Sequence, residues 1–69
     1  MHGDRYKLYA EPDGGPQSYL LADNDLAMAR FQAERIADLS PAGTNVVVYL
    51  DGFPLFAVRG TITQPGIWG

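Results

Sequence analysis

The first regular feature of the chain is an alternation of apolar and polar side chains over residues 5–11. Every second residue from Tyr6 to Ala10 is apolar, and a period of two is typical of a half-buried strand. Proline, aspartate and glycine fill residues 12–16 and favour a reversal of the chain. Residues 17–21 then return as a short second strand, so we predict a β-hairpin with a loop longer than two residues.

A helical repeat replaces this alternation over residues 24–39. Residues 23–25 (Asp-Asn-Asp) precede its first apolar residue, where short oxygen-bearing side chains can accept hydrogen bonds from the first helical turn. Pro41 ends the helix, because the residue before a proline avoids the helical region. The face that we expect to pack on a sheet carries Leu26, Ala29, Ala33, Ile36 and Ala37. Three of these five residues are alanine, so the helix can lie close to its neighbours.

The most strand-like segment covers residues 44–50, where β-branched and aromatic side chains dominate. An Asp-Gly turn signal follows, and Pro54 has no backbone N–H to donate, so we predict a loop over residues 51–54. Residues 55–59 then return as a fourth strand.

The order of elements is therefore β-β-α-β-β. It predicts an α+β fold with one four-stranded, mainly antiparallel sheet and a single helix packed on one face. A length of 69 residues allows one domain, which we place in residues 1–60. Residues 61–69 are expected to form a C-terminal tail that packs on the domain or on a partner.

The second predicted hairpin is apolar on both faces. Val47 and Tyr49 lie on one face of the third strand, and three further apolar residues lie on its other face. The fourth strand repeats this arrangement, with Phe56 and Val58 on one of its two apolar faces. A single helix covers only one face of a sheet, so the tail, a second copy of the chain or a different protein should cover the other. An exposed apolar surface of this kind favours association, and we expect a homodimer.

Phe31 lies outside the predicted core face of the helix, with Met28 at the margin of the same sector. Three roles are open for Phe31: it belongs to a contact patch, it is covered by the tail, or it is a single exposed aromatic residue. In the tail, Ile67 and Trp68 are costly to leave in water and serve as packing anchors or as contacts between chains. The predicted interface residues are Phe31, Met28, Val47, Tyr49, Phe56, Val58, Ile67 and Trp68.

Composition narrows the possible partners. The chain has no cysteine, which excludes disulfides and metal sites built from cysteine. Its net charge of −3 disfavours binding to nucleic acid. Arg5, Lys7 and Arg59 would form a small basic edge only if the first and last strands were adjacent. No apolar run approaches the ~20 residues that span a bilayer, and no signal peptide is visible. We therefore expect a cytoplasmic protein without membrane or nucleic-acid partners.

Candidate catalytic groups are few. The one histidine, His2, lies at the N-terminus and cannot by itself build a metal site or a catalytic triad. Asp23 and Asp25 are explained by helix capping, and the glycines of residues 13–15 by a turn. We predict no catalytic, cofactor-binding or metal-binding residue, and no enzymatic activity.

These observations favour a small interaction domain that forms a homodimer through an apolar sheet face. In size and element order the chain resembles small uncharacterised bacterial and phage proteins, and loosely the small inhibitors that phages use against bacterial defence systems. That resemblance implies, as an alternative, an inhibitor or adaptor of phage or mobile-element type that docks on a different protein by the same surface. A second alternative is an oligomer that binds a small planar ligand against Tyr49 or Trp68.

Overall fold

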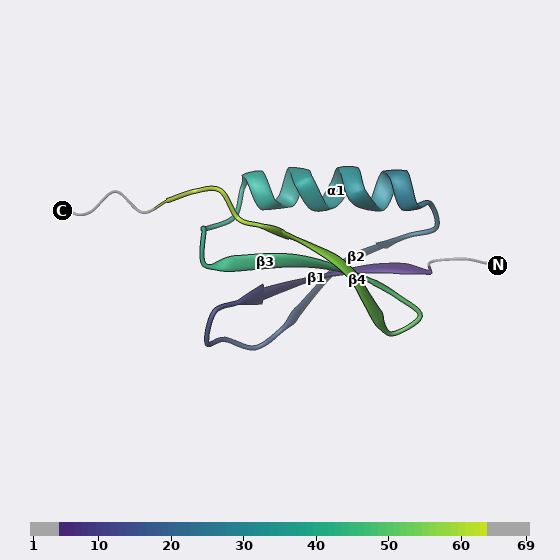
Figure 1. The fold of residues 1–69 in the computed structure, drawn as a ribbon, viewed down its shortest axis with the longest axis horizontal. Coiled ribbons are helices and arrows are strands. Elements are labelled where there is room, and N and C mark those ends of the chain that lie inside the picture. Colours follow the sequence, from purple (N-terminus) through teal and green to yellow (C-terminus); the bar gives the residue numbers. More distant parts are fainter. Residues whose placement is uncertain (1–4, 64–69) are drawn as a thin grey trace.

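The computed structural model describes residues 5–63 of the chain. These residues form one sheet and one helix, with the elements β1 (Tyr6–Pro12), β2 (Ser18–Asp23), α1 (Leu26–Asp38), β3 (Thr44–Leu50) and β4 (Phe53–Arg59). All neighbouring strands are antiparallel in the order β2-β1-β3-β4, and α1 lies along one face of the sheet (Figure 1). The predicted α+β class and β-β-α-β-β order are confirmed.

Local capping sets the ends of α1. The Asp25 carboxylate accepts a hydrogen bond of 3.2 Å from the backbone N–H of Met28, which satisfies a donor of the first turn. At the other end, the Leu39 backbone N–H donates to the Ile36 carbonyl at 3.0 Å. The helix therefore spans residues 26–38, inside the predicted range of 24–39.

The last strand begins earlier than predicted. β4 starts at Phe53, so the loop predicted over residues 51–54 is wrong in its second half. Pro54 pairs with Tyr49 inside the hairpin, which is possible because β4 is an edge strand of the sheet. The register shifts between Val48 and Tyr49, and this irregularity absorbs one extra residue of β4.

The core lies between α1 and the sheet. Its buried residues are Leu8, Ala29, Ala33, Ala37, Val46 and Val48. The alanines of α1 allow the helix to approach the valines of β3 closely, as the sequence predicts. Leu26 departs from the predicted helix face, since 44% of it stays exposed at the first turn.

The segment after β4 is fastened to the end of the helix. The Thr61 backbone N–H donates to the Ala37 carbonyl at 3.1 Å, and the Ile62 N–H donates to the Ser40 carbonyl at 3.0 Å. Ile62 also forms an isolated bridge with Pro41. The start of the predicted tail thus packs on the domain, whereas the predictions for Ile67 and Trp68 lie outside the described residues.

Candidate functional site

The side of the sheet that faces away from α1 is called here the open face. Its side chains come from all four strands and include Lys7, Tyr9, Glu11, Tyr19, Val47, Tyr49, Ala57 and Arg59. In Figure 1 the β1–β2 and β3–β4 turns both lie on this side of the sheet, opposite the helix. The described chain therefore leaves one complete sheet face without a covering layer.

An apolar row crosses the centre of the open face. Tyr19, Tyr9, Val47 and Ala57 are successive partners across β2, β1, β3 and β4. The Tyr9 and Tyr19 rings lie edge to face, with centroids 5.6 Å apart. Val47 is only 7% exposed although no helix lies above it, whereas Tyr19 is 58% exposed. The row combines a sheltered centre with an aromatic side chain that is open to solvent.

Tyr49 is held over this row by hydrogen bonds at its hydroxyl. The hydroxyl donates to the Glu11 carboxylate at 2.7 Å and accepts from the Gln17 amide at 3.1 Å. The Gln17 amide also donates to Glu11 at 2.6 Å. The ring lies edge to face with Tyr9, at 5.3 Å between centroids. The hydrogen bond to Glu11 raises the pKa of Tyr49 above its ordinary value, with smaller contributions from desolvation and from the Glu11 charge.

Charged side chains surround the row in an uneven pattern. Arg5 pairs with Asp51 at 3.4 Å, and Arg59 pairs with Asp13 at 3.2 Å. Within residues 5–63, Lys7 makes no ion pair, and Glu11 has hydrogen-bond donors but no cationic partner. The two uncompensated charges of β1 on the open face are therefore opposite in sign and lie at opposite ends of it.

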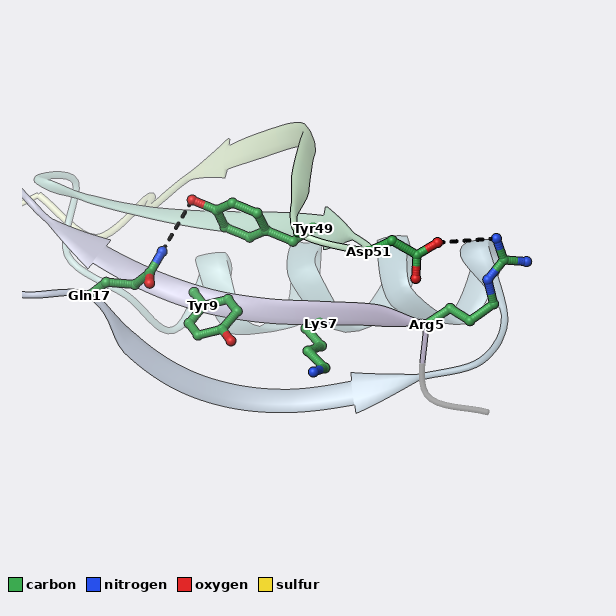
Figure 2. Close-up of a pocket in the computed structure, with 7 residues that line it drawn as sticks. Arg5, Lys7, Tyr9, Gln17, Tyr49 and Asp51 are labelled. Atoms are coloured by element: carbon green, nitrogen blue, oxygen red, sulfur yellow. Dashed lines mark hydrogen bonds and ion pairs between the residues drawn. The ribbon is translucent and has the colours of Figure 1, made fainter. Parts of the chain in front are cut away.

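A hollow of about 380 Å³ opens beside Lys7. Figure 2 shows the side chains that line it, with the Tyr9 and Tyr49 rings at one end, the Arg5–Asp51 pair at the other, and Lys7 extending from β1 toward β2. Its lining residues are Arg5, Lys7, Tyr9, Gln17, Tyr49, Asp51 and Gly52. Two cations and one carboxylate give the lining a net positive charge, so the hollow suits an anionic group.

The predicted interface residues do not share one surface. Val47 and Tyr49 lie on the open face, but Phe56 and Val58 pair with Val48 and Val46 and pack against the core. The Arg30 guanidinium of α1 lies 5.0 Å from the Phe56 ring centroid, which confirms that this ring faces the helix side.

The two predicted helix residues lie on a different exposed surface. Phe31 is 52% exposed and Met28 is 45% exposed, both on α1. The basic edge is also divided, because β1 and β4 lie on opposite sides of β3. Arg59 is paired with Asp13 rather than grouped with Lys7.

Sequence reasoning missed Tyr9, Tyr19 and Glu11 as members of the surface. For Tyr9 and Glu11 the signal was present in the alternation of β1, which sends Lys7, Tyr9 and Glu11 away from Leu8. The side of Tyr19 depends on the register shift between β1 and β2, which the sequence does not show. The alternation does not predict that β1 lies in the centre of the sheet, next to β3.

Among the described residues, no group of three histidine, aspartate or glutamate side chains is placed to hold a metal ion. The helix α1, the one helix within residues 5–63, lacks the length and apolarity needed to cross a membrane. Comparison with known proteins finds no matching family model, curated protein or solved structure. The function must therefore be argued from the open face itself.

Proposed function

We propose that this protein is a small interaction domain that forms a homodimer, with the open face of one copy packed against the open face of another. The observation that carries the proposal is the row of two tyrosines, a valine and an alanine across the four strands, on a face that the helix does not cover. Tyrosine combines an apolar ring with a polar end, so it suits a surface that is wet in the monomer and buried in a complex.

The small core supports a need for further burial. Three of the six residues in the buried cluster are alanine, and the chain has no cysteine for a disulfide. A domain of this size buries only about 60% of its unfolded surface and is marginally stable on its own. Packing the open faces together would add apolar burial without changing the fold.

The size of the open face sets the strength of the expected dimer. Four strands about 4.8 Å apart, each about six residues long at ~3.3 Å per residue, cover a flat area of about 400 Å². The accessible area is larger because side chains corrugate the surface, yet it falls at or below the about 800 Å² per partner of a standard interface. We therefore expect a dissociation constant in the micromolar range, and a dimer that dissociates on dilution.

The test is the solution mass from light scattering on a sizing column over a concentration series. Wild type should shift from dimer to monomer on dilution, and Tyr19→Ser should weaken the dimer about tenfold or more. Phe31→Ser is the matched control, because Phe31 is exposed to a similar degree on the helix and should leave the dissociation constant unchanged.

Two results would overturn the proposal. A monomer at every concentration would exclude the homodimer and leave the open face for a different protein. A dimer that is broken by Phe31→Ser but kept by Tyr19→Ser would move the interface to the outer surface of α1.

A further inference from the structure

We infer that the hollow beside Lys7 receives Glu11 of the second copy, so that the two sheets pack antiparallel about a two-fold axis that crosses their strands. This inference rests on the proposed homodimer and adds the orientation of its two copies. It also assigns an occupant to the hollow, namely a carboxylate supplied by an identical chain.

The charge pattern along β1 is the first argument. Lys7, Tyr9 and Glu11 alternate onto the open face, with the cation and the carboxylate about 13 Å apart and the tyrosine midway. Other charged residues near them, such as Arg5 and Arg59, already have partners in the chain. Among the described residues, β1 thus presents on the open face one cation and one carboxylate that have no oppositely charged partner, which is a self-complementary pattern.

Two-fold symmetry turns this pattern into a choice between two arrangements. An axis that runs across the strands exchanges their ends, so Lys7 of each copy faces Glu11 of the other and the two Tyr9 rings meet at the axis. An axis that runs along the strands keeps the ends together, so lysine gathers with lysine and glutamate with glutamate. In an isologous interface each contact between different residues occurs at two symmetric places, so the attraction or the repulsion between these charges acts at both.

Sheet shape permits either arrangement, which leaves the decision to the charges. The twist of the sheet carries the two hairpin turns onto the open side at opposite ends (Figure 1). Two sheets of the same handedness, related by a two-fold axis between them, keep parallel surfaces and can stack over the whole face. In the crossing arrangement the apolar row from Tyr19 to Ala57 also packs on its own copy.

The hollow matches the group that this arrangement brings to it. Its lining has a net positive charge from Arg5, Lys7 and Asp51, and the rings of Tyr9 and Tyr49 border it (Figure 2). The incoming Glu11 carboxylate is already oriented in its own copy by Tyr49 and Gln17, so little side-chain freedom remains to be lost on binding.

Charge reversal tests the inference. Lys7→Glu and Glu11→Lys should each weaken their own homodimer about tenfold or more, because both variants then face like charges across the axis. An equimolar mixture of the two variants should recover the wild-type mass, since each copy again meets the opposite charge. The recovery should shrink in high salt, which screens exposed charges.

The outcomes separate this inference from the proposed function. If wild type dimerises and Tyr19→Ser disrupts it, but Lys7→Glu and Glu11→Lys each form a homodimer as tight as that of wild type, the orientation is wrong and the homodimer stands. If wild type is a monomer throughout, both fail.

Lys7→Glu also gives a test that does not depend on replacing the hydrogen-bonded Glu11. If the axis crosses the strands, the mixed dimer of Lys7→Glu with wild type should have an affinity between those of the two homodimers. One end of this mixed dimer attracts and the other repels. A mixed dimer tighter than both homodimers would place lysine opposite lysine and overturn the inference.

Discussion

The hydroxyl of Tyr49 donates a hydrogen bond of 2.7 Å to the carboxylate of Glu11, from a residue 38 positions further along the chain. This bond joins β3 to β1 on the open face, and Gln17 completes a three-membered network with both side chains. The network fixes the Tyr49 ring across the face, at right angles to the neighbouring Tyr9 ring. A surface whose aromatic side chains are held in place before binding loses less entropy when a partner arrives.

The first prediction concerns the ionisation of Tyr49. Its pKa is raised chiefly by the hydrogen bond to Glu11, so the folded state favours the protonated phenol. This stability is fully present below the ordinary tyrosine value of about 10 and is lost as the pH rises through the raised pKa. The tyrosinate absorbance of wild type minus Tyr49→Phe should show Tyr49 ionising above its ordinary value.

Glu11→Gln is the control for the cause of this shift. A neutral amide oxygen accepts a weaker hydrogen bond than a carboxylate, and the negative charge is gone, so the pKa of Tyr49 should fall part of the way toward its ordinary value. If Tyr49 ionises at the same pH in Glu11→Gln as in wild type, the carboxylate is not the cause.

The fold was predictable where its signals are local. Asp25 caps the helix, and the residues after Asp38 end it, as the pattern of polar, apolar and proline residues indicates. The strand over residues 44–50 was predicted at its observed bounds because valine and tyrosine dominate it. The error at Phe53 arose from treating Pro54 as a barrier to pairing, when an edge strand with a shifted register can include it.

The candidate surface was less predictable because it depends on pairing between distant segments. Alternation shows that Val47 and Phe56 each have a defined side, but it does not show that they lie on opposite sides of the sheet. The pairing of Val48 with Phe56 decides this, and it depends on the register shift before Tyr49. The meeting of Glu11 with Tyr49 likewise requires β1 to lie beside β3, which no local pattern states.

The second prediction tests the close approach of α1 to the sheet. Ala33 is fully buried between the helix and the valines of β3, so Ala33→Leu should lower the free energy of unfolding by about 1–3 kcal/mol through overpacking. Ala27→Leu introduces the same side chain on the exposed side of the helix and should change stability by less than about 0.5 kcal/mol. Urea denaturation measures both, and equal effects at the two positions would contradict the packing argument.

The third prediction concerns the start of the helix. Asp25→Ala removes the acceptor of the Met28 N–H and should cost about 1 kcal/mol of stability in thermal or urea unfolding. Asp25→Asn keeps a side-chain oxygen at the same place and should cost much less. Asp38→Ala removes a carboxylate from the opposite end of α1, where the helix dipole disfavours negative charge, and should be neutral or slightly stabilising. A loss at Asp38 as large as that at Asp25 would show that net charge, rather than capping, determines the effect.

The last prediction concerns Gly60, where the chain leaves β4 and passes beneath the end of the helix. A Cβ atom at this buried position would overlap the Pro41 carbonyl group and lie 2.7 Å from the Ser40 carbonyl oxygen. These are backbone atoms, and the Pro41 carbonyl also accepts the Thr44 N–H at 2.9 Å, so neither can move without breaking local structure. Gly60→Ala should therefore lower the free energy of unfolding by about 1–3 kcal/mol or more.

Gly43→Ala is the matched control, since its nearest neighbour would be the Asp13 carboxylate at an ordinary 3.5 Å. Hydrogen exchange gives a second readout, because Gly60→Ala should deprotect the Thr61 and Ile62 amides that bind the helix end. Unchanged protection of these amides, together with wild-type stability, would show that the chain passes Pro41 by another path.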